Sequence, residues 1–424
     1  MSRYILTSVV FLLVWLSCFS QSKSSVTFEK GSIRYDVIFV GSADTFFLVH
    51  DQTKILTKRD GDVLVDDVDY GNYRYRINDV VTGQLIFKKG LSPLFYEWFT
   101  TVEAKVKTAS SSYSFFFPMT VNDVRFSFDV RDAKNNWREI YADTVYISDF
   151  HVVNETPIVY PIDTIIFSGK SDEKIDVAIL AEGYTESEMD KFSKDARRMV
   201  DTLLGCQPFK EYANRFNFIA VKVPSLESGS DVPGDKIYKN TAFNSTYYTF
   251  DSPRYLTTSD MKLVYNAVDG VVWDHLIVLV NSDIYGGGGF YNSMSICSAD
   301  NARSNFVFCH EFGHAFAGLA DEYYTSQVSY EEFYRGDVEP WEPNITTLVD
   351  FNSKWKPMIY NSTPIPTPRD SMFVGHIGVF EGGGYVEKGV YSPSTTCWMK
   401  EMAAGKFCPV CQDAIRKTIL RQSK

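Results

Sequence analysis

His310-Glu-Phe-Gly-His314 follows the apolar run Phe306-Val-Phe308, which favours a mostly buried helix for the whole stretch. On an α-helix, residues i and i+4 lie on the same face, so His310 and His314 can offer imidazole nitrogens to one ion. Glu311 would then stand beside that ion as a carboxylate able to accept a proton. The pentapeptide therefore predicts a metal site, with ordinary polar helix residues as the alternative interpretation.

The residues downstream strengthen this prediction. Gly318 can end the helix in a left-handed turn, and Asp321 follows three residues later. In metzincin peptidases a Gly-x-x-His or Gly-x-x-Asp step after the histidine pair supplies the third zinc ligand. Here the glycine and the acid both come one residue later than in that motif. We expect Asp321 as the third ligand, with Glu322 as its rival.

A ligand from a second helix, the other zincin arrangement, is ranked lower because the candidate acids lack a helical context: Glu331, Glu332 and Glu339. Further along the chain, Met399 lies in the turn-like segment Ser394-Thr-Thr-Cys-Trp-Met-Lys-Glu401. A metzincin would place such a methionine beneath its zinc, whereas simple core packing is the alternative.

Taken together, these segments resemble the family of the bacterial IgA-specific metallopeptidase over roughly residues 163–424. The matching stretches are Ile175-Asp-Val-Ala-Ile-Leu-Ala-Glu-Gly-Tyr184, His310 to Tyr323, Val379-Phe-Glu-Gly-Gly-Gly-Tyr385, Cys397-Trp-Met399 and Phe407-Cys-Pro-Val-Cys411. The resemblance implies a peptidase, but the family name records one member's substrate and does not assign antibodies to this chain.

The expected mechanism follows from these residues. His310, His314 and Asp321 would hold Zn²⁺, and Glu311 would deprotonate the activated water and pass the proton to the leaving amine. The oxyanion needs a further donor. Tyr385 and Tyr391 are candidates because they lie shortly before the methionine turn, although chance is a strong alternative in a chain with 26 tyrosines.

Composition predicts two domains in an α+β chain of 424 residues. Residues 26–160 contain short alternating runs, such as Tyr35-Asp-Val-Ile-Phe-Val40, which favour an N-terminal antiparallel β-sandwich. Residues 161–424 alternate apolar strands with helical patterns, typical of an α/β zincin-like catalytic domain. We expect the segment 285–298, with its four consecutive glycines, to form the strand that borders the cleft.

The first 20 residues resemble a signal peptide, because an apolar run follows a short basic start. Cleavage after Ser20 would release a soluble protein, so that the mature N-terminal domain spans 21–160, whereas Cys18 could instead carry a lipid anchor. Either outcome predicts an exported protein, located in the periplasm, on the cell surface or outside the cell. No later stretch is long and apolar enough to cross a bilayer.

The net charge of -11 argues against a nucleic-acid surface, which relies on clustered Lys and Arg. Beyond Cys18 the cysteines are Cys206, Cys297, Cys309, Cys397, Cys408 and Cys411. Cys408-Pro-Val-Cys411 has no second pair at zinc-finger spacing. Structural pairing or buried thiols are therefore the expected state, ahead of a second metal site.

The favoured function is a secreted or surface-anchored zinc endopeptidase acting on extracellular or host proteins, with immunoglobulin-like proteins among the candidates. One alternative is a surface binding protein with a vestigial zinc domain, against which the intact Glu311 speaks. Another is a zinc hydrolase of small peptides or non-peptide amides, which a closed, narrow cleft would favour.

Overall fold

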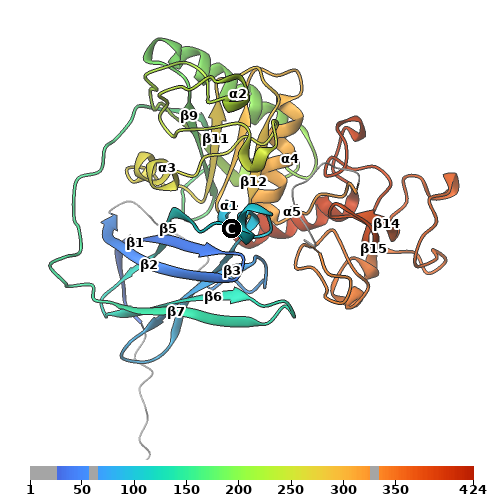
Figure 1. Cartoon of the computed structure of the whole chain (residues 1–424), viewed down its shortest axis with the longest axis horizontal. Helices are drawn as coiled ribbons and strands as arrows, with labels where there is room; N and C mark the ends of the chain where they lie inside the picture. Colours follow the sequence, from blue (N-terminus) through green and yellow to red (C-terminus); the bar gives the residue numbers. More distant parts are fainter. Residues whose placement is uncertain (1–25, 57–64, 325–333) are drawn as a thin grey trace, which may run out of the picture.

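The computed structural model describes residues 26–56, 65–324 and 334–424 (Figure 1). The expected signal peptide and Cys18 lie outside the described residues, as do Glu331 and Glu332. Two antiparallel sheets make up the described part of the N-terminal half, with strand orders β2-β1-β5 and β4-β3-β6-β7. Their strands are β1 Phe28–Ser42, β2 Thr45–Leu56, β3 Tyr73–Asp79, β4 Leu85–Leu91, β5 Ala109–Thr120, β6 Val124–Arg131 and β7 Trp137–Val145.

The core between these two sheets is made of aromatic rings. Period-two alternation turns every second residue of a strand inward, and β3 accordingly buries Tyr73 and Ile77. Phe126 of β6 lies with its ring centroid 4.6 Å from Tyr35 of β1 and 5.2 Å from Phe115 of β5. The antiparallel N-terminal half that the alternating runs predicted is confirmed.

The C-terminal half is built on a six-stranded mixed sheet of order β12-β13-β11-β9-β10-β8. The four inner strands are parallel to one another, while β8 and β12 run antiparallel at the two edges. The strands are β8 Ile162–Ile166, β9 Ile175–Glu182, β10 Phe216–Val221, β11 His275–Val280, β12 Gly287–Phe290 and β13 Met294–Ser298. The predicted glycine-rich edge strand is β12. It is antiparallel because only a short turn joins it to β13, and a parallel pair needs a longer crossover.

Helices cover this sheet and connect its strands. They are α2 Met189–Gly205, α3 Met261–Val268, α4 Ser304–Ala317 and α5 Pro409–Gln422, with the short α1 Leu94–Phe99 in the N-terminal half. Helix α4, which carries the histidine pair, packs on β12 and β13 and against α2 and α5 (Figure 1). A hairpin of β14 Phe380–Gly383 and β15 Val386–Ser392 projects beyond α5.

Polar contacts from α2 fix the position of the segment that leads into α4. Lys191 donates to Asp195 at 2.9 Å and to Asp300 at 2.7 Å. Arg198 donates to Asn305, in the first turn of α4, at 2.7 Å. The histidine helix is therefore tied to its neighbour by charged hydrogen bonds as well as by apolar packing.

The two halves share a continuous apolar core. Phe116 of β5 lies 5.1 Å, centroid to centroid, from Trp273, and Tyr113 lies 5.7 Å from Tyr265 of α3. Arg34 of β1 is 0% exposed and donates to Asp269, just after α3, at 2.9 Å. The N-terminal sheets are therefore packed firmly against the C-terminal half.

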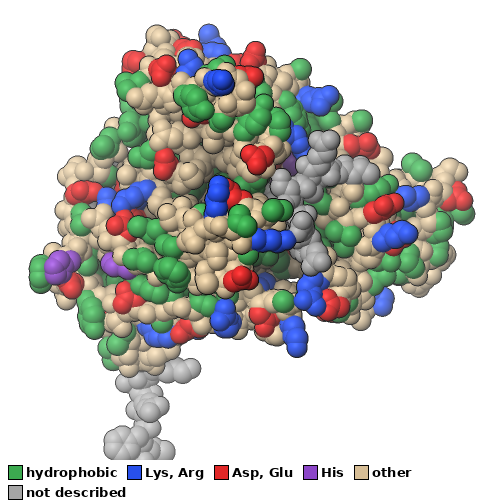
Figure 2. Space-filling model, viewed as in Figure 1, with side chains coloured by type: hydrophobic (Ala, Val, Ile, Leu, Met, Phe, Trp, Pro, Cys, Tyr) green, Lys and Arg blue, Asp and Glu red, His purple; other side chains and the backbone are tan. Residues whose placement is uncertain are grey.

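Figure 2 shows Lys and Arg side chains interspersed with Asp and Glu over the face in view. Among the helices that the structure describes, none combines the length and apolar character required to cross a bilayer.

Candidate metal centre

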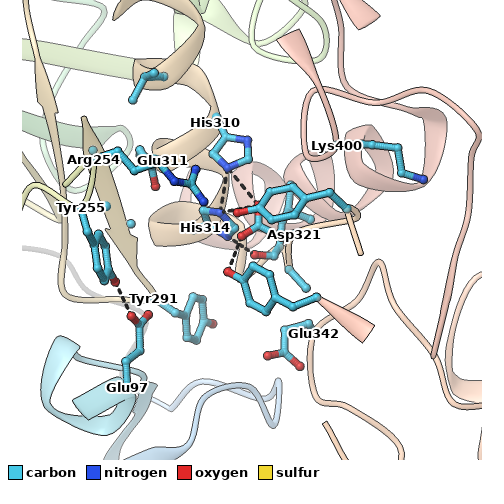
Figure 3. A pocket seen from close by; sticks show the side chains of 18 of the residues that line it. Glu97, Arg254, Tyr255, Tyr291, His310, Glu311, His314, Asp321, Glu342 and Lys400 are labelled. Atoms are coloured by element: carbon cyan, nitrogen blue, oxygen red, sulfur yellow. Dashed lines mark hydrogen bonds and ion pairs between the residues drawn. The ribbon is translucent and has the colours of Figure 1, made fainter. Parts of the chain in front are cut away.

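Helix α4 presents His310, Glu311 and His314 toward one cavity (Figure 3). His310 Nε2 and His314 Nε2 lie 3.2 Å apart. The i,i+4 spacing thus brings two ring nitrogens side by side, as the sequence predicted.

The chain turns back after α4 and adds a carboxylate. Gly318 ends the helix in the left-handed region, with φ 64°, and its N–H donates to the His314 carbonyl at 3.0 Å. Asp321 Oδ1 lies 3.0 Å from His310 Nε2 and 3.4 Å from His314 Nε2. Asp321, the expected third ligand, therefore faces both histidines.

Backbone carbonyls orient the two imidazoles. His310 Nδ1 lies 2.9 Å from the Trp398 carbonyl oxygen, and His314 Nδ1 contacts that of Leu319. A ring that donates through Nδ1 keeps a lone pair on Nε2 when it is neutral. With both rings neutral, two such lone pairs and an Asp321 carboxylate oxygen would converge at one point. A metal ion is the group that stabilises this arrangement, so these residues fit a bound metal.

The Asp321 carboxylate makes this position favourable for positive charge. Burial alone would lower the pKa of both imidazoles, but the carboxylate outweighs it, raising the pKa of His310 and bringing that of His314 to about 9. Burial would raise the pKa of Asp321, yet the two histidines hold that pKa well below its usual range. The acid is therefore ionised in its resting state.

Tyr385 holds the aspartate in place. Its hydroxyl donates to Asp321 Oδ2, which leaves Oδ1 turned toward the histidines. Two backbone hydrogen bonds join the Tyr385 segment to the Asp321 segment. The Gly384 N–H donates to the Asp321 carbonyl at 2.8 Å, and the Tyr385 N–H donates to the Tyr323 carbonyl at 2.9 Å. Tyr385, predicted to contact the substrate oxyanion, is hydrogen-bonded to Asp321, the candidate third ligand.

Glu311 lies beside the three ligand side chains, half-buried against the glycine strand β12. A Cβ on Gly287 would lie 3.0 Å from Glu311 Cγ, and one on Gly289 would lie 2.3 Å from the Glu311 carbonyl oxygen. Only glycines allow this strand to pass so close to α4. Burial raises the pKa of Glu311 above its ordinary value, which suits a carboxylate that exchanges protons.

The cavity in front of these residues measures about 600 Å³. The N-terminal half contributes to its lining through Asn72, Ser92 and Glu97. Glu97 accepts a hydrogen bond from the Tyr255 hydroxyl across the boundary between the halves (Figure 3). The cavity is therefore bounded by both halves of the chain.

Asp321 and Glu322, the two candidates for the third metal ligand, have different surroundings. Glu322, the rival to Asp321, points to another cluster, where its Oε1 lies 3.0 Å from Cys411 Sγ. Met399 is fully buried beneath α4, and a Cβ on Gly313 would lie 3.1 Å from its sulfur. The Glu322 N–H donates to the Met399 carbonyl at 2.7 Å, so the methionine turn is tied to the ligand segment.

Other predicted candidates lie elsewhere. Glu339 accepts hydrogen bonds from Thr347 and from the Asp350 N–H, away from the histidines. Tyr391 is not among the described residues that line the cavity. Its backbone pairs with Thr346, and its side chain packs against the core around α4.

Among the cavity-lining side chains that sequence reasoning missed are Arg254, Tyr285 and Tyr323. Asp321, two residues before Tyr323, was identified from its spacing, but tyrosines are so frequent in this chain that Tyr285 and Tyr323 gave no signal of a role in the site. Arg254 lies in an irregular segment before α3 without periodicity, and its charge acts on both Glu311 and Tyr323. A lone arginine in a long irregular segment gives no recognisable signal.

These features together define a class, the metallopeptidases, in which one helix carries both histidines and the acid that works beside them. The family model described as IgA Peptidase M64 matches residues 164–373 and 369–419, and the model described as Peptidase M64 N-terminus matches residues 24–142. The chain belongs to the M64 peptidase family, which confirms the resemblance seen in its motifs. Comparison with curated proteins gives no match.

Proposed function

We propose that this protein is an exported zinc endopeptidase that cleaves extracellular proteins, for which immunoglobulin-like proteins are one candidate class. The observation that carries the proposal is the convergence of His310 Nε2, His314 Nε2 and Asp321 Oδ1 beside Glu311 in a cavity that both halves line. Family membership supports peptide hydrolysis as the reaction.

Zn²⁺ is the metal best suited to two imidazoles and one carboxylate with a position left open. When bound, the ion supplies a Lewis acid that polarises a carbonyl and lowers the pKa of a water molecule toward ~7. His310, His314 and Asp321 would hold it, and Tyr385 keeps Asp321 oriented. The domain arrangement that we propose is metzincin-like, since a glycine turn precedes the third ligand and a buried Met399 lies beneath the helix.

Glu311 moves the proton. Its carboxylate accepts a proton from the attacking water as the new C–O bond forms, and it delivers that proton to the amide nitrogen as the C–N bond breaks. The burial that raises its pKa matches it to this exchange.

Arg254 is the group that we assign to the developing oxyanion, since it lines the cavity and is charged. Tyr385 has one hydroxyl proton, which it already donates to Asp321, and therefore acts as a positioning residue.

Substrate binding would use the edge of β12 beyond Gly287, since Gly287 itself forms a parallel bridge with Tyr255. An extended peptide can add to such an edge through main-chain hydrogen bonds. We propose residues 21–160 and 161–424 as the mature N-terminal and catalytic domains, with export directed by residues 1–20 and with lipid anchoring at Cys18 as the alternative to cleavage after Ser20.

The experiment compares wild-type protein with Glu311→Gln and Asp321→Ala for zinc content and for cleavage of dye-labelled casein and of an immunoglobulin. Glu311→Gln should keep its zinc and lose turnover by at least about 100-fold, the usual contribution of a general base. Asp321→Ala should carry one zinc fewer than wild type. Full activity of Glu311→Gln would refute the mechanism, and unchanged zinc in Asp321→Ala would refute the ligand set.

A further inference from the structure

A second group of potential ligands lies on the far side of the Asp321 segment. It consists of Glu322, Cys397, Cys408 and Cys411, whose ligand atoms all lie within 4.8 Å of one another. None of the four residues is more than 2% exposed. Three separate segments supply them: the residue after Asp321, the methionine turn and the start of α5. Consecutive residues in an extended chain face opposite sides, so Asp321 and Glu322 serve different clusters.

The distances match metal ligation better than a disulfide. Cys397 Sγ and Cys411 Sγ are 3.7 Å apart, and Glu322 Oε1 lies 3.0 Å from Cys411 Sγ and 3.7 Å from Cys408 Sγ. A tetrahedral zinc with Zn–S bonds of about 2.3 Å separates two sulfurs by about 3.8 Å, whereas a disulfide requires about 2.05 Å. All six described cysteines are unpaired.

The carboxylate of Glu322 has no described cation in direct contact with it, although the charge of Lys400 acts on it from farther away. Its Oε2 is buried without a hydrogen-bond partner, and among the described residues Glu322 forms no ion pair. Its other oxygen accepts a hydrogen bond from Asn344 at 3.2 Å and otherwise lies against the Cys411 and Cys408 thiols. A buried carboxylate that is neither paired nor fully hydrogen-bonded is costly. A cation at the centre of the cluster would remove this cost.

Backbone amides favour a thiolate at one of the sulfurs, that of Cys397. The N–H groups of Cys408 and Met399 point at Cys397 Sγ, with N···S distances of 3.2 and 3.4 Å. Cys408 is the residue that precedes α5, and Cys411 lies in the first turn of that helix. A helix N-terminus stabilises negative charge and lowers the pKa of nearby thiols. The amide contacts to Cys397 and the helix N-terminus beside Cys408 and Cys411 suit metal-bound thiolates.

We propose that Glu322, Cys397, Cys408 and Cys411 bind a structural divalent cation, for which zinc is the best fit. Three thiolates and one carboxylate provide a closed four-ligand set, without the open position that catalysis requires. The ion would clamp the Asp321 segment, the Met399 turn and the start of α5 together. This inference differs from the expectation of plain buried thiols and stands independently of the proposed peptidase activity.

The test counts zinc in the full chain, purified with a reductant, by inductively coupled plasma mass spectrometry. Wild type should hold two zinc ions per chain, the double variant His310→Ala/His314→Ala one, and Cys408→Ser one. Cys206→Ser is the matched control, because it removes a half-buried thiol outside the cluster, and it should keep both ions.

A second measurement covers the case in which Cys408→Ser fails to fold. The His310→Ala/His314→Ala protein is loaded with Co²⁺, and we expect a thiolate-to-cobalt charge-transfer band, which ligands without sulfur cannot give. A wild-type protein with a single zinc, lost entirely in the histidine variant, would overturn the proposal. The absence of the charge-transfer band, or a Cys397–Cys411 disulfide found by peptide mass spectrometry, would overturn it as well.

Discussion

Replacing Gly289 with alanine tests how closely the glycine strand approaches the histidine helix. A Cβ at this position would lie 2.3 Å from the Glu311 carbonyl oxygen, 2.8 Å from His314 Cβ and 3.0 Å from Glu311 C. The φ of Gly289 is not in the left-handed region, so alanine fits the backbone and the cost is purely steric. The atoms in the way belong to the backbone and Cβ of α4, which cannot rotate aside.

The size of the effect follows from these distances. Ordinary van der Waals contact begins near 3.4 Å, so strand and helix must separate by about 1.1 Å. Overpacking of this kind costs about 1–3 kcal/mol of the free energy of unfolding. A displacement of about 1 Å in catalytic groups can also reduce kcat/KM by about 100-fold.

Urea denaturation measures the first quantity, and cleavage of dye-labelled casein measures the second. Gly288→Ala is the matched control, because its Cβ would meet ring atoms of Tyr255 and Phe290 at 3.1 and 3.2 Å, which can shift, and the Leu256 carbonyl oxygen at an ordinary 3.4 Å. If Gly289→Ala unfolds like wild type, within about 0.5 kcal/mol, and cleaves casein equally well, the close approach of β12 to α4 is wrong.

Three further changes probe other contacts. Burial alone would raise the pKa of Asp195, but hydrogen bonds from Lys191 and Arg198 hold that pKa below its ordinary value. The stability that a depressed carboxyl pKa provides is present above the unfolded pKa and is lost as pH falls through the folded pKa. Asp195→Asn should therefore lower the free energy of unfolding by about 2 kcal/mol at pH 7 and by progressively less below about pH 4. Urea denaturation at pH 7 and pH 3 checks this, and a pH-independent difference would contradict it. Tyr385→Phe removes the hydrogen bond to Asp321 and should weaken zinc affinity about 10–100-fold, measured by competition with a chelating dye; unchanged affinity would rule out the positioning role. Arg34→Met leaves two buried aspartates unpaired and should lower the free energy of unfolding by about 3–5 kcal/mol, whereas a loss under about 1 kcal/mol would mean that this ion pair does not hold the halves together.

Local patterns predicted the part of the site that one helix and one turn create. His310, Glu311 and His314 follow from helical periodicity, and Gly318 supplies the left-handed turn that returns Asp321 to them. The strands of both halves were likewise visible, because alternation and apolar runs are properties of short segments. The antiparallel edges of the mixed sheet were not visible, since they depend on pairing partners.

Contacts between distant segments could not be read from the sequence. Glu97 reaches the cavity only because the N-terminal sheets pack beside β12, and Glu322 meets Cys411 across 89 residues of chain. The sequence shows no second cysteine pair at zinc-finger spacing from Cys408 and Cys411, because the residues that lie beside them, Glu322 and Cys397, come from two other segments. Tyr391 was selected by its distance in sequence from Met399, but it is not among the described residues that line the cavity.

The core that the two halves share also limits how this protein can change over generations. Phe116 packs on Trp273, and Tyr113 on Tyr265, so a substitution on one side of the boundary alters the fit of a ring on the other. A recombination event that joined this N-terminal half to a foreign peptidase would bring together unmatched aromatic surfaces. The two halves are therefore expected to be inherited as a pair, with compensating substitutions across their boundary.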